Sequence, residues 1–121
     1  MTHTVRVLIV DDQEPFRSAA RLVVELTDGF EVAGEASTGE EGIALVGRLA
    51  PDLILMDIQM PEMDGLQATR QIVADDQTAR VVVLSTYEAA EYEQLALEAG
   101  ACAFISKSDF GPAELAAAWD N

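Results

Sequence analysis

The sequence is short of basic residues, and nearly all of those it has are arginines. Seven basic side chains stand against 22 acidic ones, which gives a formal net charge of −15 at pH 7. Lys107 is the only lysine in the chain. Because a surface this negative repels a phosphate backbone, we do not expect the chain itself to bind nucleic acid.

Further absences exclude other classes of protein. Cys102 is the only cysteine, so the chain has neither an internal disulfide nor a Cys/His cluster for zinc, and Cys102 is predicted to be a small core residue. No apolar run reaches the roughly 18 residues needed to cross a bilayer, and no basic-then-apolar leader opens the chain. We therefore expect one domain over residues 1–121, located in the cytoplasm and without a membrane partner.

Half of the residues are hydrophobic, and they fall into two kinds of segment. Five short runs rich in β-formers predict strands at Val5–Val10, Phe30–Ala36, Asp52–Met56, Arg80–Leu84 and Ala103–Ile105. The first, third and fourth runs are apolar without alternation. That pattern is typical of strands covered on both faces, as in a parallel sheet.

Segments with helical spacing of apolar residues follow these runs. They lie at Phe16–Val23, Ile43–Ala50, Leu66–Val73, Tyr92–Ala99 and Pro112–Trp119. Thr38–Glu41 has the pattern of a capping box, and Pro112 suits a first helical turn. Strand and helix alternating five times predict a doubly wound α/β fold, a (βα)5 three-layer sandwich around a parallel sheet.

Charged and hydroxyl side chains follow four of the predicted strands. Asp11 and Asp12 follow the first, Asp57 the third, Ser85 the fourth, and Lys107 comes shortly after the fifth. An aspartate in such a place usually forms a turn or caps a helix, and a loop lysine is usually exposed. However, open α/β sheets bind ligands at the carboxyl ends of their strands, where these residues would converge.

Three carboxylates at one edge repel each other, and one of them would take up a proton unless a cation were present. Magnesium suits such a site because it prefers oxygen ligands and keeps several waters. A carboxylate beside it is a competent nucleophile toward phosphorus, and a lysine can offset charge on the transferred phosphoryl oxygens. The residue types therefore predict a magnesium-assisted aspartyl phosphorylation site.

Four stretches together resemble the receiver domain of two-component response regulators: Val7–Asp12, Asp52–Gly65, Val83–Ser85 and Ala99–Lys107. The resemblance covers nearly the whole chain. Its later part, Leu84–Ser108, is most similar to the NarL/FixJ branch, whose output is a LuxR-type helix-turn-helix. The resemblance implies a flavodoxin-like fold with five parallel strands in the order 2-1-3-4-5.

Carried over by position, the resemblance assigns roles at the strand ends. It implies that Asp57 is the phosphoacceptor and that Lys107 pairs with the phosphoryl group. Asp12 and Asp57 would bind Mg²⁺ directly, together with the backbone carbonyl of Gln59, and Asp11 would act through water. We expect Mg²⁺ as the only cofactor.

The resemblance also implies a conformational switch. Ser85 would be the hydroxyl that moves to bond a phosphoryl oxygen, and Phe104 the aromatic side chain that turns inward. Thr86 adjoins Ser85 and could take the same role, but counting back from Lys107 favours Ser85.

Three further positions bear on the site. Ser108 stands where many receivers have proline, so a cis peptide after Lys107 is not assured. Gln59 and Tyr87 are bulky and flank the path of an attacking water in this family. They predict slow-to-moderate self-dephosphorylation.

The expected function is phosphorelay signal transduction, with a sensor histidine kinase as phosphoryl donor. Beyond its own phosphotransfer and autodephosphorylation, the chain is not expected to be an enzyme. A homodimer is allowed, and DNA would be reached only through an output domain outside this chain. Two alternatives remain open: a stand-alone receiver, and a pseudo-receiver that only docks proteins. Pseudo-receivers usually lack an acid or the lysine, and none is missing here.

Trp119 falls on the apolar stripe of the last predicted helix. Packing into the core is the simpler interpretation. A contact with a second copy or a downstream domain is the alternative, because aromatic side chains are enriched at interfaces.

Overall fold

The computed structural model describes residues 3–86 and 90–120. In these ranges five strands alternate with five α-helices, and one short 3-10 helix follows the last strand. The elements are β1 (Val5–Val10), α1 (Glu14–Leu26), β2 (Phe30–Ala36), α2 (Gly39–Leu49), β3 (Leu53–Asp57), α3 (Gly65–Asp75), β4 (Arg80–Ser85), α4 (Ala90–Glu98), β5 (Ala103–Ser106), η1 (Lys107–Asp109) and α5 (Pro112–Asp120).

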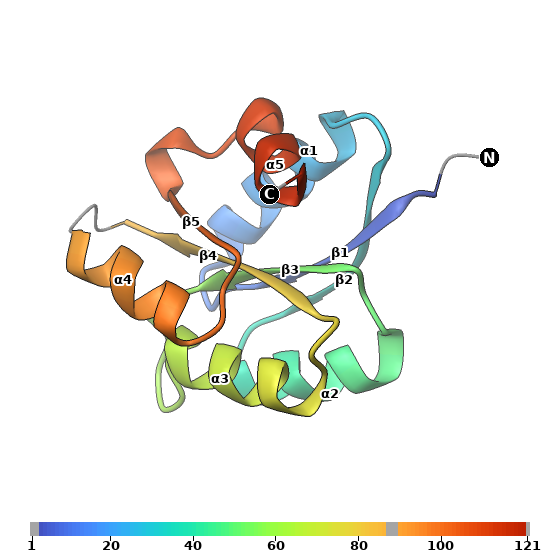
Figure 1. Ribbon diagram of the computed structural model, residues 1–121. Coiled ribbons are helices and arrows are strands. Elements are labelled where there is room, and N and C mark those ends of the chain that lie inside the picture. The colour runs from blue at the N-terminus through green and yellow to red at the C-terminus, as the bar shows by residue number, and fades with distance from the viewer. Residues whose placement is uncertain (1–2, 87–89, 121) are drawn as a thin grey trace.

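The strands form one parallel sheet in the order β2-β1-β3-β4-β5, as predicted. Figure 1 shows α1 and α5 on one face of the sheet, with α2 and α3 on the other face and α4 beside them. All five strands point their carboxyl ends toward the same edge. The winding direction reverses between β1 and β3, which is where an open α/β sheet leaves a crevice.

Two of the strand ends carry predicted site residues inside the sheet itself. The bounds of β1 and β2 agree with the prediction, but β3 runs to Asp57 and β4 to Ser85, one residue further than predicted. Asp57 pairs with Leu84 in the ladder between β3 and β4. The backbone at both side chains is therefore fixed by the sheet rather than by a loop.

The core has two parts, one on each face of the sheet. The part facing α1 and α5 is built from Val5, Val7, Ile9, Ala20, Val24, Leu53, Leu55, Val82, Leu84, Leu115 and Ala118. The opposite part includes Leu8, Val10, Ile54, Met56, Ile72, Val81 and Val83. Successive strand residues alternate between these parts, so the unbroken apolar runs are explained by burial on both sides.

A bulge interrupts the pairing of β1 with β2. Val7 lies opposite Val32, but the next residue, Leu8, lies opposite Gly34, so Ala33 is the extra residue. Beyond the bulge Ile9 lies opposite Glu35. Since Ile9 faces α1, the bulge turns Glu35 toward α1 as well.

The predicted capping box at α2 is only half formed. The Thr38 hydroxyl accepts a hydrogen bond from the Glu41 amide at 3.0 Å. The Glu41 carboxylate, however, accepts from the amide of Ser37 at 2.7 Å and not from that of Thr38. A complete box stands at α3, where Asp64 and Gln67 cap each other's backbone.

The last two helices agree with the predicted apolar stripes except at two residues, Leu95 and Pro112, which are both exposed. In α4, Ala96 is buried, but Leu95 was predicted on the same stripe and is 39% exposed. This prediction was wrong because α4 packs through small alanines, and Leu95 lies toward solvent. In α5, Leu115 is fully buried as expected.

Trp119 packs against the core beneath α5, which confirms the simpler interpretation. The Arg80 guanidinium lies over its ring, 4.5 Å from the centroid. Arg80 is the first residue of β4. The contact therefore ties the end of α5 to the amino-terminal edge of the sheet. Cys102, also predicted as a core residue, packs against the same cluster as a free thiol.

Among the described residues, none of the helices has the length and apolar character that a bilayer crossing requires.

Candidate functional site

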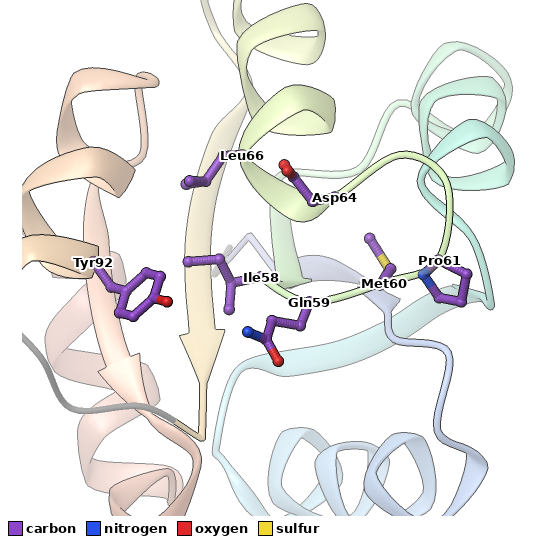
Figure 2. A pocket seen from close by; sticks show the side chains of 7 residues that line it. All are labelled: Ile58, Gln59, Met60, Pro61, Asp64, Leu66 and Tyr92. Carbon is purple, nitrogen blue, oxygen red and sulfur yellow. The ribbon is translucent and has the colours of Figure 1, made fainter.

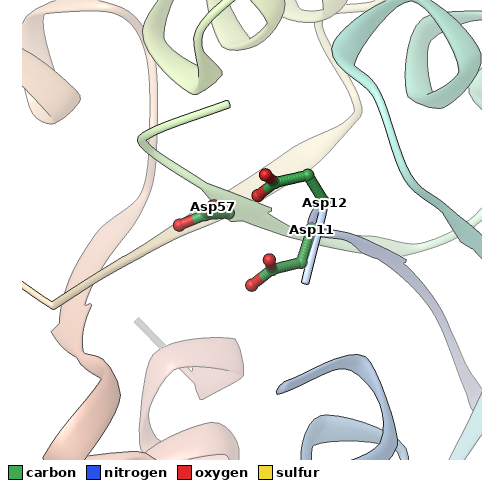
Figure 3. A group of neighbouring side chains, drawn as sticks. All are labelled: Asp11, Asp12 and Asp57. Atoms are coloured by element: carbon green, nitrogen blue, oxygen red, sulfur yellow. The ribbon is translucent and has the colours of Figure 1, made fainter. Parts of the chain in front are cut away.

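Three carboxylates meet at the carboxyl edge of the sheet, where Asp11 and Asp12 follow β1 and Asp57 ends β3. Figure 3 shows their side chains extending from adjacent strand ends toward the same side. Oxygen atoms from all three lie within 4.8 Å of one another. Asp11 and Asp57 are buried, whereas Asp12 is exposed. The sequence prediction that these acids converge is confirmed.

Lys107 enters this group from the first residue of η1. Its ammonium nitrogen lies 2.8 Å from Asp11 Oδ2 and 3.1 Å from Asp57 Oδ1. It also lies 4.3 Å from the ring centroid of Phe16. The lysine side chain is only 9% exposed, so its charge is directed at the two carboxylates. The peptide after Lys107 is trans, since no described peptide bond is cis.

The buried charges shift the titration of both partners. Burial, together with the neighbouring charge of Asp11, raises the pKa of Asp57 to about 6, although Lys107 acts in the opposite direction. Burial alone would lower the pKa of Lys107. The hydrogen bond to Asp11 and the charges of Asp57 and Asp11 outweigh it, and the pKa is raised. At neutral pH the site therefore holds a lysine cation and a carboxylate that is still mostly ionised.

Each polar atom of Asp11, in the side chain and in the backbone, makes a hydrogen bond. Its carboxylate accepts hydrogen bonds from Lys107 on Oδ2 and from the Gln13 amide on Oδ1, both at 2.8 Å. Its own amide donates to the Ala36 carbonyl at 3.0 Å. Its carbonyl accepts from Arg17 at 2.7 Å. Asp11 is thus a fixed feature of the site rather than a mobile surface acid.

The donor set fits Mg²⁺. Mg²⁺ takes carboxylate oxygens as ligands, and oxygens of the three acids lie within 4.8 Å of one another. Both oxygens of Asp11 already accept hydrogen bonds. The three carboxylates together form a donor set of the kind that Mg²⁺ prefers.

The loop after β3 runs past the acids and borders a groove of about 490 Å³. Figure 2 shows Gln59 and Tyr92 facing this groove from the loop and from α4. Gln59 is exposed and sits two residues beyond Asp57. Tyr87, the other residue predicted to flank an attacking water, lies outside the described residues.

Gly65 brings the end of this loop back onto β3. Its amide donates to the Ile58 carbonyl at 2.9 Å. A Cβ at this position would stand 2.0 Å from the carbonyl oxygen of Asp57. The close approach explains a glycine here, although the residue begins a helix, where glycine is otherwise unfavourable.

Ser85 and Phe104, the two predicted switch residues, lie on neighbouring strands. Ser85 ends β4, is fully buried and pairs with Ser106 of β5. Phe104 pairs with Val83 and is half-buried against the core between the sheet and α3. Thr86, one residue beyond Ser85, is exposed.

Sequence reasoning missed two residues that contact this group and a third that pairs with one of them. Phe16 covers the Lys107 ammonium, and Arg17 bonds the Asp11 carbonyl, while Glu35 pairs with Arg17. The position of Arg17 six residues after Asp11, on the helix that leaves the site, was an available signal. Nothing in the pattern placed Glu35 on this face, because its orientation depends on the bulge.

The chain matches the family described as "Response regulator receiver domain" over residues 7–120. It belongs to that family. Receiver domains accept a phosphoryl group in phosphorelay signalling, bind Mg²⁺ at an acidic pocket, and interact with histidine kinases and output domains. The resemblance inferred from the motifs is confirmed. This receiver has an acidic cluster, formed by Asp11, Asp12 and Asp57, at the carboxyl edge of its sheet.

Individual relatives of this receiver point to more than one kind of output. It is 39% identical over 111 residues to the uncharacterized transcriptional regulatory protein YhcZ of Bacillus subtilis (strain 168), covering 92% of this chain and 51% of YhcZ. It is 43% identical over 104 residues to a protein-glutamate methylesterase/protein-glutamine glutaminase of Alkalilimnicola ehrlichii, covering 85% of this chain and 27% of that protein.

Among solved structures, the receiver domain of the putative response regulator NarL from Mycobacterium tuberculosis superposes with a TM-score of 0.88. The two are 30% identical, and the match covers 98% of this chain and 99% of the other. Regulators of the NarL and LuxR type thus stand among the relatives of this receiver. The chain spans about half the length of the curated transcriptional regulators that it matches.

Proposed function

We propose that this receiver accepts a phosphoryl group from a histidine kinase onto Asp57 and changes conformation in response. One observation carries the proposal. Asp57 is a buried carboxylate at a strand end, with a lysine ammonium 3.1 Å away and two further carboxylates beside it. A structural ion pair would need only one acid for Lys107, whereas this site gathers three.

In the proposed transfer, an Asp57 carboxylate oxygen attacks phosphorus. The new oxygen–phosphorus bond forms as the bond from phosphorus to the donor's histidine nitrogen breaks, and that nitrogen keeps the electron pair. Lys107 then pairs with a phosphoryl oxygen instead of with the free Asp57 carboxylate. The raised pKa of Asp57, about 6, leaves it ionised and nucleophilic at pH 7.

Asp12 and Asp57 would hold Mg²⁺ together with the backbone carbonyl of Gln59, and Asp11 would contact it through water. When bound, the ion offsets negative charge on the carboxylates and on the transferred phosphoryl group. Lys107 and the Gln13 amide each donate a hydrogen bond to one oxygen of Asp11.

The proposed conformational response involves Ser85 and Phe104. Ser85 follows Leu84, whose carbonyl accepts a hydrogen bond from the Ile58 amide at 3.1 Å. This places the start of the loop after β4 beside the end of β3. A phosphoryl oxygen on Asp57 would draw the Ser85 hydroxyl toward it. Phe104, only half-buried on the adjacent strand, would turn inward as that loop moves.

For the whole protein we propose a phosphorelay regulator whose output is a LuxR-type helix-turn-helix, with residues 1–121 as one receiver domain. The transcriptional regulators among its relatives support this output, and the methylesterase relative represents a different one. In our proposal the receiver catalyses only its own phosphorylation and dephosphorylation. Self-association stays a prediction, and sedimentation with and without a phosphoryl mimic tests it.

The central test is incubation of the chain with an acyl phosphate, in Mg²⁺ and in EDTA. We expect one phosphoryl group per chain in Mg²⁺ and almost none in EDTA, as measured by intact-mass spectrometry. Borohydride reduction followed by peptide mapping should locate the modification at Asp57. Absence of labelling in Mg²⁺ would instead support the pseudo-receiver alternative, in which the chain acts only by docking.

The Gln59 side chain gives a second prediction, on the lifetime of the phosphorylated form. It is exposed two residues beyond Asp57 and lines the adjacent groove, and we propose that it hinders the approach of water to the phosphoryl group. Gln59→Ala is expected to accelerate the decay of labelled protein several-fold, measured by the loss of phosphate over time. Gln71→Ala, at an exposed position of α3, is the control. Gln67→Ala is unsuitable because the Gln67 side chain accepts a capping hydrogen bond from the Asp64 amide. An unchanged decay in Gln59→Ala would contradict the prediction.

A further inference from the structure

Arg17, Arg21 and Glu35 form a charged network on the α1 side of the sheet, and this network contacts the backbone of Asp11. The Arg17 guanidinium donates to the Asp11 carbonyl at 2.7 Å and lies 3.6 Å from Glu35 Oε1. Arg21, one turn further along α1, lies 2.9 Å from Glu35 Oε2. Glu35 thus sits between two arginines, and one of these reaches the strand end that carries Asp11.

The position of Glu35 is a consequence of the bulge in β2. In an unbroken register, Val10 would lie opposite Glu35, and Glu35 would face α2 and α3 as Val10 does. The extra residue Ala33 moves Glu35 opposite Ile9 and reverses its side. Bulges beside functional sites commonly redirect a side chain in this way. Here the result is a carboxylate placed against α1, where both arginines meet it.

Arg17 is largely shielded from solvent, with a side chain 17% exposed, and Glu35 is 27% exposed. An arginine in this position carries a planar set of donors, so it can serve two acceptors with its orientation fixed. Its ion-pair partner is Glu35 on β2, 3.6 Å away, and its hydrogen-bond acceptor is the carbonyl at the start of the Asp11–Asp12 turn, 2.7 Å away. The guanidinium therefore connects the bulged strand to the turn that presents both carboxylates.

We propose that Arg17, oriented by Glu35, is a positioning residue that holds the Asp11–Asp12 turn in the geometry required for Mg²⁺ binding. The proposal rests on the proposed function, because that function assigns Mg²⁺ to this turn. Arg17 itself touches neither the ion nor the phosphoryl group. It acts through the backbone of Asp11.

The two roles that Arg17 could have predict opposite changes in Mg²⁺ affinity when the residue is removed. If Arg17 acted only through its charge, its removal would make the electrostatic potential at the three carboxylates more negative. Mg²⁺ would then bind more tightly. If it positions the turn, its removal weakens Mg²⁺ binding. Losing the residue that orients a metal ligand typically lowers metal affinity by about 10- to 100-fold.

The experiment is a calorimetric titration of the chain with Mg²⁺. Arg17→Met is expected to raise the Mg²⁺ dissociation constant by about tenfold or more. Arg21→Met is the matched control. It removes the same charge from the same Glu35 but has no contact with Asp11, so its Mg²⁺ affinity should be unchanged or slightly tighter. Thermal unfolding in EDTA shows whether each variant is folded, and Arg17→Gln replaces Arg17→Met in the same assay should the latter fail to fold.

Arg17→Met or Arg17→Gln binding Mg²⁺ as tightly as the wild type, or more tightly, would overturn the proposal. Equal weakening by Arg21→Met would overturn it too, since the effect would then not depend on the Asp11 contact. Failure of the proposed function has a different signature. In that case the wild-type chain itself binds no Mg²⁺ and accepts no phosphoryl group, and a positioning role for Arg17 is excluded with it.

Discussion

An Asp57→Asn variant is expected to accept no phosphoryl group from an acyl phosphate under conditions in which the wild-type chain is labelled in Mg²⁺. The amide keeps the shape of the side chain but is not a nucleophile, and it removes one of the two acids proposed to bind the ion directly. The loss should be complete rather than partial, since the other buried acid, Asp11, has both oxygens engaged by Lys107 and Gln13. Intact-mass spectrometry provides the measurement.

The same substitution is expected to stabilise the metal-free protein. Burial and the nearby Asp11 charge raise the pKa of Asp57 to about 6 in the folded chain, well above the ordinary aspartate pKa of about 3.9, so the folded state binds the proton more strongly than the unfolded state. Ionising Asp57 therefore costs folding free energy that is absent below about pH 4, grows between about pH 4 and 6, and is complete above. Asp57→Asn removes this cost, on the order of 1–3 kcal/mol at pH 7.

Urea unfolding in EDTA at a series of pH values measures that gain. The difference between Asp57→Asn and the wild type should be small at pH 4 and largest at pH 7. Added Mg²⁺ should reduce it, because the ion binds the folded wild type. Asp28→Asn, an exposed change between α1 and β2, is the control and should show no such trend. A labelled Asp57→Asn protein, or a gain that is independent of pH, would contradict the assignment of Asp57.

Gly65→Ala is expected to destabilise the chain by about 3 kcal/mol or more, near the upper end of single substitutions. The new Cβ would lie 2.0 Å from the Asp57 carbonyl oxygen and 2.9 Å from the Ile58 Cα. Both are backbone atoms, so no side chain can move aside. The loop between β3 and α3 must shift instead, which displaces the backbone at the proposed phosphoacceptor. Urea unfolding followed by circular dichroism measures the loss.

Gly47→Ala provides the matched control for this experiment. Gly47 lies within α2, and a Cβ there would meet nothing within 4 Å. Alanine is the better helix former, so this variant should gain about 0.5–1 kcal/mol. The same chemical change then has opposite signs at two positions. Near-wild-type stability of Gly65→Ala would show that the loop is more adaptable than this packing implies.

The sheet could be predicted from the sequence because its central strands are buried on both faces. Every residue of β3 is buried, and the four that precede Asp57 form an unbroken apolar run that identifies the strand. The site followed from the topology. Once the strands are parallel, Asp11, Asp57 and Lys107 must approach one edge, whatever the loops between them do. The family match supports the same interpretation.

Details that depend on local hydrogen bonding were not predictable from pattern. Glu41 could cap either Ser37 or Thr38, and only the backbone geometry selects Ser37. The network of Arg17 and Glu35 was missed for a stronger reason. In a regular strand Glu35 would face the opposite side of the sheet, and a single inserted residue reverses it. Gly34 beside the bulge was a hint, because a glycine inside a strand often marks one.

The stacking of Arg80 on Trp119 has a consequence for optical measurements. Trp119 is the only indole of the chain. Arg80 pairs with Leu53 at the start of β3, whereas Asp57 ends that strand. Tryptophan emission therefore reports on the seating of α5 and on global unfolding, and it is remote from occupancy of the acidic site. A change of Trp119 emission on phosphorylation would therefore mean that a structural change at Asp57 had reached the opposite end of the sheet. Trp119 fluorescence can thus be used to detect such a long-range change.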